Sequence, residues 1–199
     1  MDIEKIKSNL ETRGISCEYF ETGEEAASYL LRILNGRTIG IGGSKTIESM
    51  GLYEKLIENN KVAWHWKSED ADSARNEAYN AEVYLSSANA ISETGEIVNI
   101  DGRCNRLTGT MYNSKEVYYI IGKNKICESL EKAVWRARNV ASPLNARRFG
   151  LKTPCASGEL KCHDCSSPQR ICKEILITCG RPMGMDKMEV IIINEDLGY

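Results

Sequence analysis

The chain has 199 residues, of which 42% are hydrophobic and 27% are charged, and its formal net charge at pH 7 is −2. This length fits one domain with a sizeable core, and the balanced composition excludes a disordered chain. The absence of a basic excess argues against a nucleic-acid partner, and no apolar run is long enough for membrane insertion. The charged amino-terminal stretch lacks a signal-peptide pattern, so we expect a cytoplasmic protein.

Apolar periodicity predicts alternating helices and strands along most of the chain. The first half is expected to contain helices over 2–13, 23–34 and 44–60, interleaved with strands over 15–21, 37–43 and 62–66. A helix over 68–81 and strands over 82–92, 95–102 and 117–122 follow. A long helix over 128–150, in which Pro143 marks a break or a second helix, precedes two final strands over 172–182 and 188–199.

This alternation is typical of an α/β fold with a Rossmann-like, mostly parallel sheet flanked by helices. Parallel strands need a crossover connection, and the predicted helices provide one between successive strands. We expect a single domain over 1–199, with a cysteine-rich insertion at about 152–173 between the long helix and a late strand.

A glycine-rich turn follows the second predicted strand, in the sequence IGIGGSKTIESMG (39–51). Gly42 and Gly43 allow a ligand to approach the backbone closely, and Ser44 and Thr46 add hydroxyl donors where a helix begins. Free N–H groups at such a helix start favour an anion, so the turn is a candidate anion site. Alternatively, Ser44 is an ordinary helix N-cap.

Polar residues gather in the segment SSANAISETGEIVNIDGRCNR (86–106), around the ends of predicted strands. Ligands of open α/β sheets collect beyond the carboxyl ends of strands. Asn89 and Asn105 are candidates for hydrogen bonding to a polar ligand, and Arg106 for gripping a carboxylate or phosphate through two parallel bonds. Asp101 could position a neighbour or take a proton.

Glu93 is a candidate general base or nucleophile if it is buried. The surrounding sequence ETGE (93–96) is also a good hairpin turn, in which Glu93 and Glu96 would both be solvated. We favour the turn.

Eight cysteines are present, and four of them fall within eighteen residues with the spacing C-x6-C-x2-C-x6-C: Cys155, Cys162, Cys165 and Cys172. Four thiolates suit tetrahedral zinc or a four-iron iron–sulfur cluster, and His163 could replace one of them at zinc. The alternatives are reduced structural thiols, and a disulfide or redox-active thiol pair. The spacing does not identify the metal. We expect Cys17, Cys127 and Cys179 to be small buried hydrophobes.

Other polar residues are expected to have ordinary roles. His65, between two tryptophans, is predicted to be a half-exposed strand residue. Arg136 and Arg138 are predicted to be charges on a helix surface. The run NARR (145–148) is interpreted as a solvated helix end rather than a phosphate site.

Taken in order, several motifs resemble the LUD domain, the lactate-utilization domain of bacterial and archaeal proteins. They are IGIGGSKTIESMGL, SSANAISETGEIVNIDGRCNRLTGTMY, IIGKNKI, ARNVASPLNARRF and IIINEDLGY, and together they span nearly the whole chain. The resemblance implies a fold similar to the superfamily of ribose-phosphate isomerases, glucosamine-phosphate deaminases and CoA-transferases. It also implies a role in oxidising L-lactate to pyruvate beside iron–sulfur protein subunits.

Carried onto this chain, the family's motif positions are Gly42, Gly43, Ser44, Thr46, Asn89, Asp101, Asn105, Arg106, Asn124 and Lys125. One departure is Cys104, where a small residue, usually glycine, would be expected before the Asn–Arg pair. A CoA-transferase of the superfamily uses a glutamate near such a turn, and Glu93 falls roughly there, by fold analogy alone.

We therefore expect a component of L-lactate oxidation that binds a small anionic or carboxylate ligand at the Gly–Gly–Ser turn. An iron–sulfur cluster or zinc would lie beside this site. The alternative is a non-catalytic sensor or scaffold that binds a sugar phosphate or nucleotide and carries a structural zinc. A third hypothesis is that the protein is a CoA-transferase or sugar-phosphate isomerase whose activity depends on Glu93 or Asp101.

Overall fold

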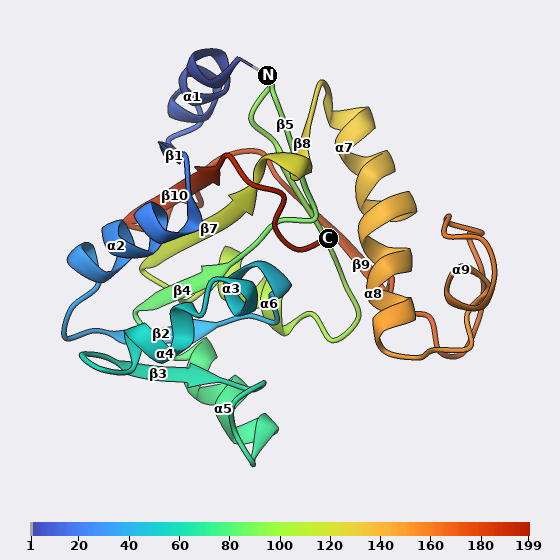
Figure 1. The fold of residues 1–199 in the computed structure, drawn as a ribbon, viewed down its shortest axis with the longest axis horizontal. Helices are drawn as coiled ribbons and strands as arrows, with labels where there is room; N and C mark the ends of the chain where they lie inside the picture. The colour runs from blue at the N-terminus through green and yellow to red at the C-terminus, as the bar shows by residue number, and fades with distance from the viewer. Residues whose placement is uncertain (1) are drawn as a thin grey trace.

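A computed structural model describes residues 2–199; Met1, part of the predicted domain, lies outside the described residues. Its centre is a six-stranded sheet in which all neighbouring strands are parallel. In spatial order the strands are β1 (Ser16–Phe20), β10 (Lys187–Ile193), β7 (Glu116–Gly122), β4 (Val83–Ser86), β2 (Thr38–Ile41) and β3 (Lys61–Trp64). The α/β fold with its parallel sheet is thus confirmed (Figure 1).

The central strands β7 and β10 read EVYYIIG and KMEVIII, and their side chains are almost all buried. Strands covered on both faces form continuous apolar runs instead of alternating patterns, because neither face meets water. This is why the sequence identified these two strands so clearly.

Helices cover both faces of the sheet. The helices α2 (Gly23–Ile33), α3 (Lys45–Ser49) and α4 (Leu52–Leu56) pack apolar side chains on one face. On the other face lie α1 (Ile3–Glu11), α5 (Ala71–Tyr79) and α6 (Asn105–Met111). Among residues 2–199, no helix is both long enough and apolar enough to cross a bilayer.

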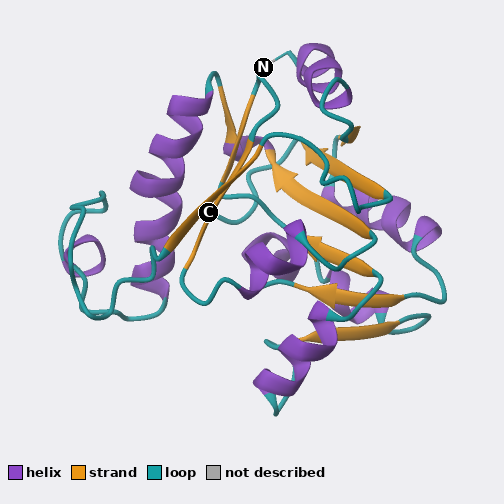
Figure 2. Cartoon of the chain, turned by 180° about the vertical axis from the view of Figure 1, so that it is seen from behind, coloured by secondary structure: helices purple, strands orange, loops and turns teal. Residues whose placement is uncertain are grey.

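A second, smaller sheet has the order β8 (Ile126–Cys127), β5 (Ala90–Ser92), β6 (Ile97–Asp101) and β9 (Glu174–Thr178). Strands β5 and β6 form an antiparallel hairpin, and β9 extends it. The long helical segment comprising α7 (Leu130–Arg136), a π-helical turn (Ala137–Ala141) and α8 (Ser142–Arg148) packs along this sheet, as the view from behind also shows (Figure 2). The sequence did not predict this separate sheet.

Several predicted boundaries were wrong. The helix expected over 44–60 is two helices, α3 and α4, separated at Gly51, whose backbone is left-handed with φ of 59°. The strand expected over 82–92 is divided between the two sheets, as β4 and β5. Helix α6 was missed, and the last strand ends at Ile193, followed by an irregular tail over 194–199.

Around Pro143 the chain stays helical, and the expected break is the π-helical turn before α8. Proline lacks the N–H that would continue the preceding hydrogen bonds, which accounts for a local widening there. The cysteine segment follows α8 and contains one short helix, α9 (Pro154–Ser157), before β9 begins.

Candidate functional site

A cavity of about 530 Å³ opens where the carboxyl ends of β2 and β4 meet the second sheet and helix α8. The predicted binding residues Gly43, Ser44, Asn89, Asn105, Arg106 and Lys125 line it, together with Asp101. Gly42 and Thr46 lie directly behind this lining: Gly42 against Arg106, and Thr46 against Lys125. The structure therefore brings together every predicted binding residue.

The glycine turn is shaped by close packing. A Cβ atom on Gly42 would lie 3.0 Å from Cγ of Arg106, and one on Gly43 would lie 3.2 Å from the ring of Trp66. Ser44 caps α3, since its Oγ accepts a hydrogen bond from the Ile47 N–H at 3.2 Å. Its side chain thus acts as an N-cap and lines the cavity at the same time.

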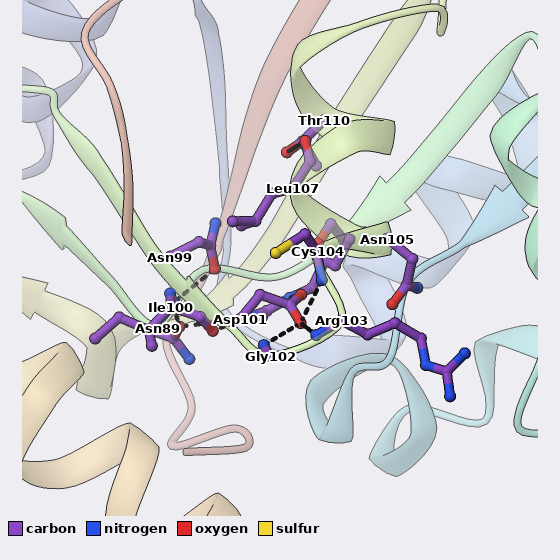
Figure 3. Close-up of polar contacts among 12 residues, drawn as sticks. Asn89, Asn99, Ile100, Asp101, Gly102, Arg103, Cys104, Asn105, Leu107 and Thr110 are labelled. Atoms are coloured by element: carbon purple, nitrogen blue, oxygen red, sulfur yellow. Dashed lines mark hydrogen bonds and ion pairs between the residues drawn. The ribbon is translucent and has the colours of Figure 1, made fainter. Parts of the chain in front are cut away.

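Asp101 organises the turn that leads into α6. Its Oδ1 accepts hydrogen bonds from the backbone N–H groups of Gly102, Arg103 and Cys104 at 2.7, 3.1 and 3.2 Å (Figure 3). Its Oδ2 lies 3.3 Å from Nε of Arg106. With these contacts, Asp101 is placed to hold the turn and Arg106.

Arg106 is held rigidly at the cavity wall. Its Nη2 donates to the Ile100 carbonyl at 2.7 Å and to Oδ1 of Asn89 at 3.4 Å, in addition to the Asp101 contact. Asn89 Oδ1 also accepts from the Ile100 N–H at 2.7 Å, so the amide orients the guanidinium. For Nη1 the described chain supplies no partner, which leaves one edge of the guanidinium for a ligand.

Lys125 is a buried amine without a carboxylate partner among the described residues. Its Nζ lies 2.8 Å from Oγ of Ser87 and 2.9 Å from Oγ1 of Thr46. Burial, with the nearby charges of Arg136 and Arg106, lowers the pKa of Lys125 to about 7. Sequence reasoning missed Ser87, whose one signal was its place in the polar stretch after β4.

Arg136 is half-buried, so its predicted role as a surface charge was wrong. It donates to the Asn124 carbonyl at 2.8 Å and to the Asn89 carbonyl at 2.5 Å, tying α7 to two loops behind the cavity. Arg138 is nearer the surface and reaches the cysteine segment instead, with Nη2 2.8 Å from Oδ1 of Asp164.

Cationic side chains dominate the cavity lining: Lys45, Arg75, Arg103, Arg106, Lys125, Arg148 and Arg170. The lining contains one carboxylate side chain, Asp101, and the neighbouring carboxylates Glu48, Asp72 and Asp164 pair with four of the cations. A positive excess remains, and low-dielectric walls strengthen its attraction for an anion.

Aromatic groups form one end of the cavity. The guanidinium of Arg148 lies 5.0 Å from the ring centroid of Trp66 and 4.1 Å from that of Phe149. His65 follows β3 and also lines the cavity, and burial together with Arg75 and Arg103 lowers its pKa. Asn145 and Arg148 reach the cavity too, so the NARR run is more than a solvated helix end.

Glu93 lies outside the cavity lining. It occupies the β5–β6 hairpin, with one carboxylate oxygen 3.6 Å from Nζ of exposed Lys5, and Gly95 turns the chain with φ of 98°. The predicted hairpin is confirmed, but neither glutamate is fully solvated. The side chain of Glu93 is 21% exposed, and that of Glu96, which pairs with Arg13, is 13% exposed.

The four clustered cysteines all line a second, much smaller cavity of about 30 Å³. Within it, the Asp164 N–H points to Sγ of Cys162 at 3.4 Å, and Nη2 of Arg138 lies 3.7 Å from the same sulfur. Over residues 2–199, no three His, Cys, Asp or Glu side chains are already grouped to hold a metal ion. Of the other cysteines, Cys17 is buried as expected, whereas Cys179 is exposed and Cys127 is half-buried.

The two cavities share a wall made of Ile100, Ser142, Arg170 and Ile171. Arg170 donates to the carbonyls of Cys165 and Cys172, both at 2.8 Å, so the cysteine segment fixes a cationic side chain of the larger cavity. The backbone at 171–173 also packs closely on Gly102 and Asp101.

Comparison with known proteins agrees with this architecture. The family model of the LUD domain matches residues 3–193 of this chain. The chain belongs to the LUD domain family. The motif resemblance is thereby confirmed, and family membership associates the chain with lactate utilization. A crystal structure of a DUF162 family protein from Deinococcus radiodurans is similar over 96% of both chains, with a TM-score of 0.58 and 12% identity, a likeness that shows the fold alone. No curated protein matches the chain.

Proposed function

We propose that this LUD domain binds a small carboxylate or phosphorylated anion as a component of L-lactate oxidation to pyruvate. The observation that carries the proposal is the excess of basic side chains, Arg106 among them, that line the cavity at the glycine turn. Family membership supplies the link to lactate utilization. The rigidly held Arg106 supports recognition of a carboxylate, because a pre-positioned guanidinium loses little freedom on binding.

The contacts of the candidate residues indicate a different role for each of them. Asp101 accepts three backbone hydrogen bonds and pairs with Arg106, so we assign it positioning of Arg106 instead of proton transfer. Arg106 would orient the carboxylate. The location of Glu93 outside the lining gives no geometric support to a mechanism that uses this glutamate as a nucleophile.

Isothermal titration calorimetry with L-lactate, pyruvate and inorganic phosphate tests the binding site. We expect Arg106→Met to weaken binding about tenfold or more, since a charged hydrogen bond contributes roughly 1.5–3 kcal/mol. Arg32→Met, on α2 away from the cavity, is the matched control. Equal affinity in Arg106→Met and wild type would disprove the assignment.

Turnover of L-lactate with an artificial acceptor, with and without iron–sulfur partner subunits, tests the oxidation role.

We also propose that Cys155, Cys162, Cys165 and Cys172 hold zinc or an iron–sulfur cluster. The donor set fits: four thiols face one small space, with an N–H and a guanidinium directed at Cys162 to offset thiolate charge. The small space favours a single zinc ion. Zinc would stabilise the segment, whereas a cluster would add electron transfer.

Elemental analysis and an absorbance spectrum of anaerobically purified protein distinguish the metals. We expect one equivalent of zinc, or a brown protein with absorbance near 400 nm that is lost on oxidation. Cys162→Ser should lower the metal content, and Cys179→Ser, at an exposed cysteine outside the segment, should not. Wild-type protein that retains neither zinc nor iron would exclude the site.

A second candidate function, a non-catalytic sensor of a nucleotide or sugar phosphate, is favoured by the aromatic end of the cavity. Trp66 already stacks on Trp64, with ring centroids 5.3 Å apart, so a base would stack on Trp66 in place of the Arg148 guanidinium, next to cations suited to phosphate. Quenching of tryptophan fluorescence by ATP or ribose 5-phosphate but not by lactate, and its loss in Trp66→Leu, would support this function over lactate oxidation.

A further inference from the structure

Three groups from distant parts of the chain meet at the cavity floor. Lys125 Nζ is 2.8 Å from Ser87 Oγ and 2.9 Å from Thr46 Oγ1, and the two hydroxyl oxygens are 3.3 Å apart. Ser87 directly follows β4, at the strand end where ligands of parallel sheets bind. Ser87 and Lys125 line the cavity, whereas Thr46 lies behind them and is fully buried.

The hydrogen bonding of this cluster can accommodate a neutral amine. Thr46 Oγ1 can donate to the Leu197 carbonyl at 3.3 Å, which leaves its lone pairs for Lys125. In the structure Lys125 Nζ donates to both hydroxyl oxygens, and Ser87 Oγ donates to Thr46 Oγ1. A neutral Lys125 can instead accept the Ser87 proton with its lone pair across the same 2.8 Å, while it still donates to Thr46. A charged ammonium has three donors, for which the described chain supplies two acceptors.

The charged groups around Lys125 act in the same direction. Arg106 of α6 and Arg136 of α7 both repel a proton on the amine, and no carboxylate pairs with it among the described residues. Burial and these two cations lower the pKa of Lys125 to about 7. A serine within hydrogen-bond reach of a base that a third group orients is the arrangement of an activated nucleophile.

We propose that Ser87 and Lys125 form a nucleophile–base pair that accepts an acyl group from an ester or thioester with an anionic substituent. Ser87 Oγ attacks the acyl carbonyl and its proton passes to Lys125 Nζ. The new Oγ–C bond forms, the bond from the carbonyl carbon to the leaving alkoxide or thiolate breaks, and Lys125 returns the proton to that group. Water that Lys125 deprotonates then attacks the same acyl carbon, the Oγ–C bond breaks, Ser87 Oγ takes the proton back from Lys125, and the acyl group leaves as a carboxylate.

The cavity selects the substrate class. The cationic lining, Arg106 foremost, favours a carboxylate or phosphate on the substrate. This acyl-transfer activity goes beyond lactate oxidation and does not depend on it.

Two esters that deliver the same acetyl group test the pair: 4-nitrophenyl acetate and its anionic analogue 3-carboxy-4-nitrophenyl acetate. With the full chain we expect a burst of about one equivalent of nitrophenolate, and a single acetyl group on the Ser87 peptide by mass spectrometry. The acylation rate should rise with pH around a midpoint near 7, because the base is the neutral amine.

Ser87→Ala should abolish the burst, and Lys125→Met should slow acylation by about 100-fold or more. Ser86→Ala, the neighbouring hydroxyl on β4, should behave as wild type. Thermal melts by circular dichroism establish that each variant folds.

At about pH 9, where Lys125 is largely neutral with or without the Arg106 charge, Arg106→Met should slow reaction of the anionic ester alone, so a failed anion site and a failed nucleophile give different results. No burst with either ester, or a burst that persists in folded Ser87→Ala, would overturn the proposal.

Discussion

At the scale of single residues, Cys104 shows how a local backbone requirement shapes the site. Its backbone is left-handed, with φ of 66°, a conformation that glycine adopts without the steric cost of a Cβ atom. This explains why a small residue is expected before the Asn105–Arg106 pair. Cys104 itself is not among the cavity-lining residues, so the cysteine strains the turn without changing the cavity wall.

We therefore predict that Cys104→Gly raises the free energy of unfolding by about 0.5–1 kcal/mol, the relief of strain being partly offset by a more flexible unfolded chain. Urea denaturation measures the change. The reciprocal test is Gly51→Ala, where φ is 59° and a Cβ would meet no atom within 4 Å, so strain alone should cost about 1 kcal/mol. A destabilised Cys104→Gly would show that its thiol contacts outweigh the strain.

At the scale of elements, the site depends on how the second sheet and the long helix dock on the main sheet. Arg136 of α7 bonds to the carbonyls of Asn124 and Asn89, and the 170–173 segment packs on the Asp101 turn. Helical periodicity predicts where α7 lies in the sequence, but it does not specify which carbonyls its side chains will meet. That is why Arg136 was expected at the surface.

At the scale of the whole molecule, burying Lys125 is a cost that the fold as a whole must offset. Its pKa falls from 10.5 to about 7 in the folded protein, so the unfolded chain binds more protons between these values. Stability therefore increases as the pH rises from 7 towards 10.5, and the destabilisation is complete at and below pH 7.

Lys125→Met removes this titration and keeps the side chain's length. We predict that the difference in free energy of unfolding between Lys125→Met and wild type shrinks by roughly 3 kcal/mol between pH 7 and pH 10. Chemical denaturation at several pH values gives this difference. A constant difference would mean that the amine is already solvated or paired in the native state.

Much of the fold could be predicted because its signals are local. The apolar runs of β7 and β10 can be recognised without knowing which strands lie beside them, and the glycine turn with Ser44 predicts the start of a helix. The division of 82–92 between two sheets could not be predicted, because β4 and β5 are similarly apolar and their partners, β7 and β6, are chosen by long-range packing.

The sequence by itself determined the family, the parallel sheet and part of the candidate anion site, namely the glycine turn and the Asn105–Arg106 pair, since those residues lie at strand ends and in turns whose chemistry is local. Only the tertiary structure decided that Thr46, Ser87 and Lys125 meet. They are 38 to 79 positions apart in the chain, and only the parallel pairing of β2, β4 and β7 brings these segments together. The physical reason is that side-chain periodicity encodes which face is buried, whereas contacts between strands depend on the packing of the whole core.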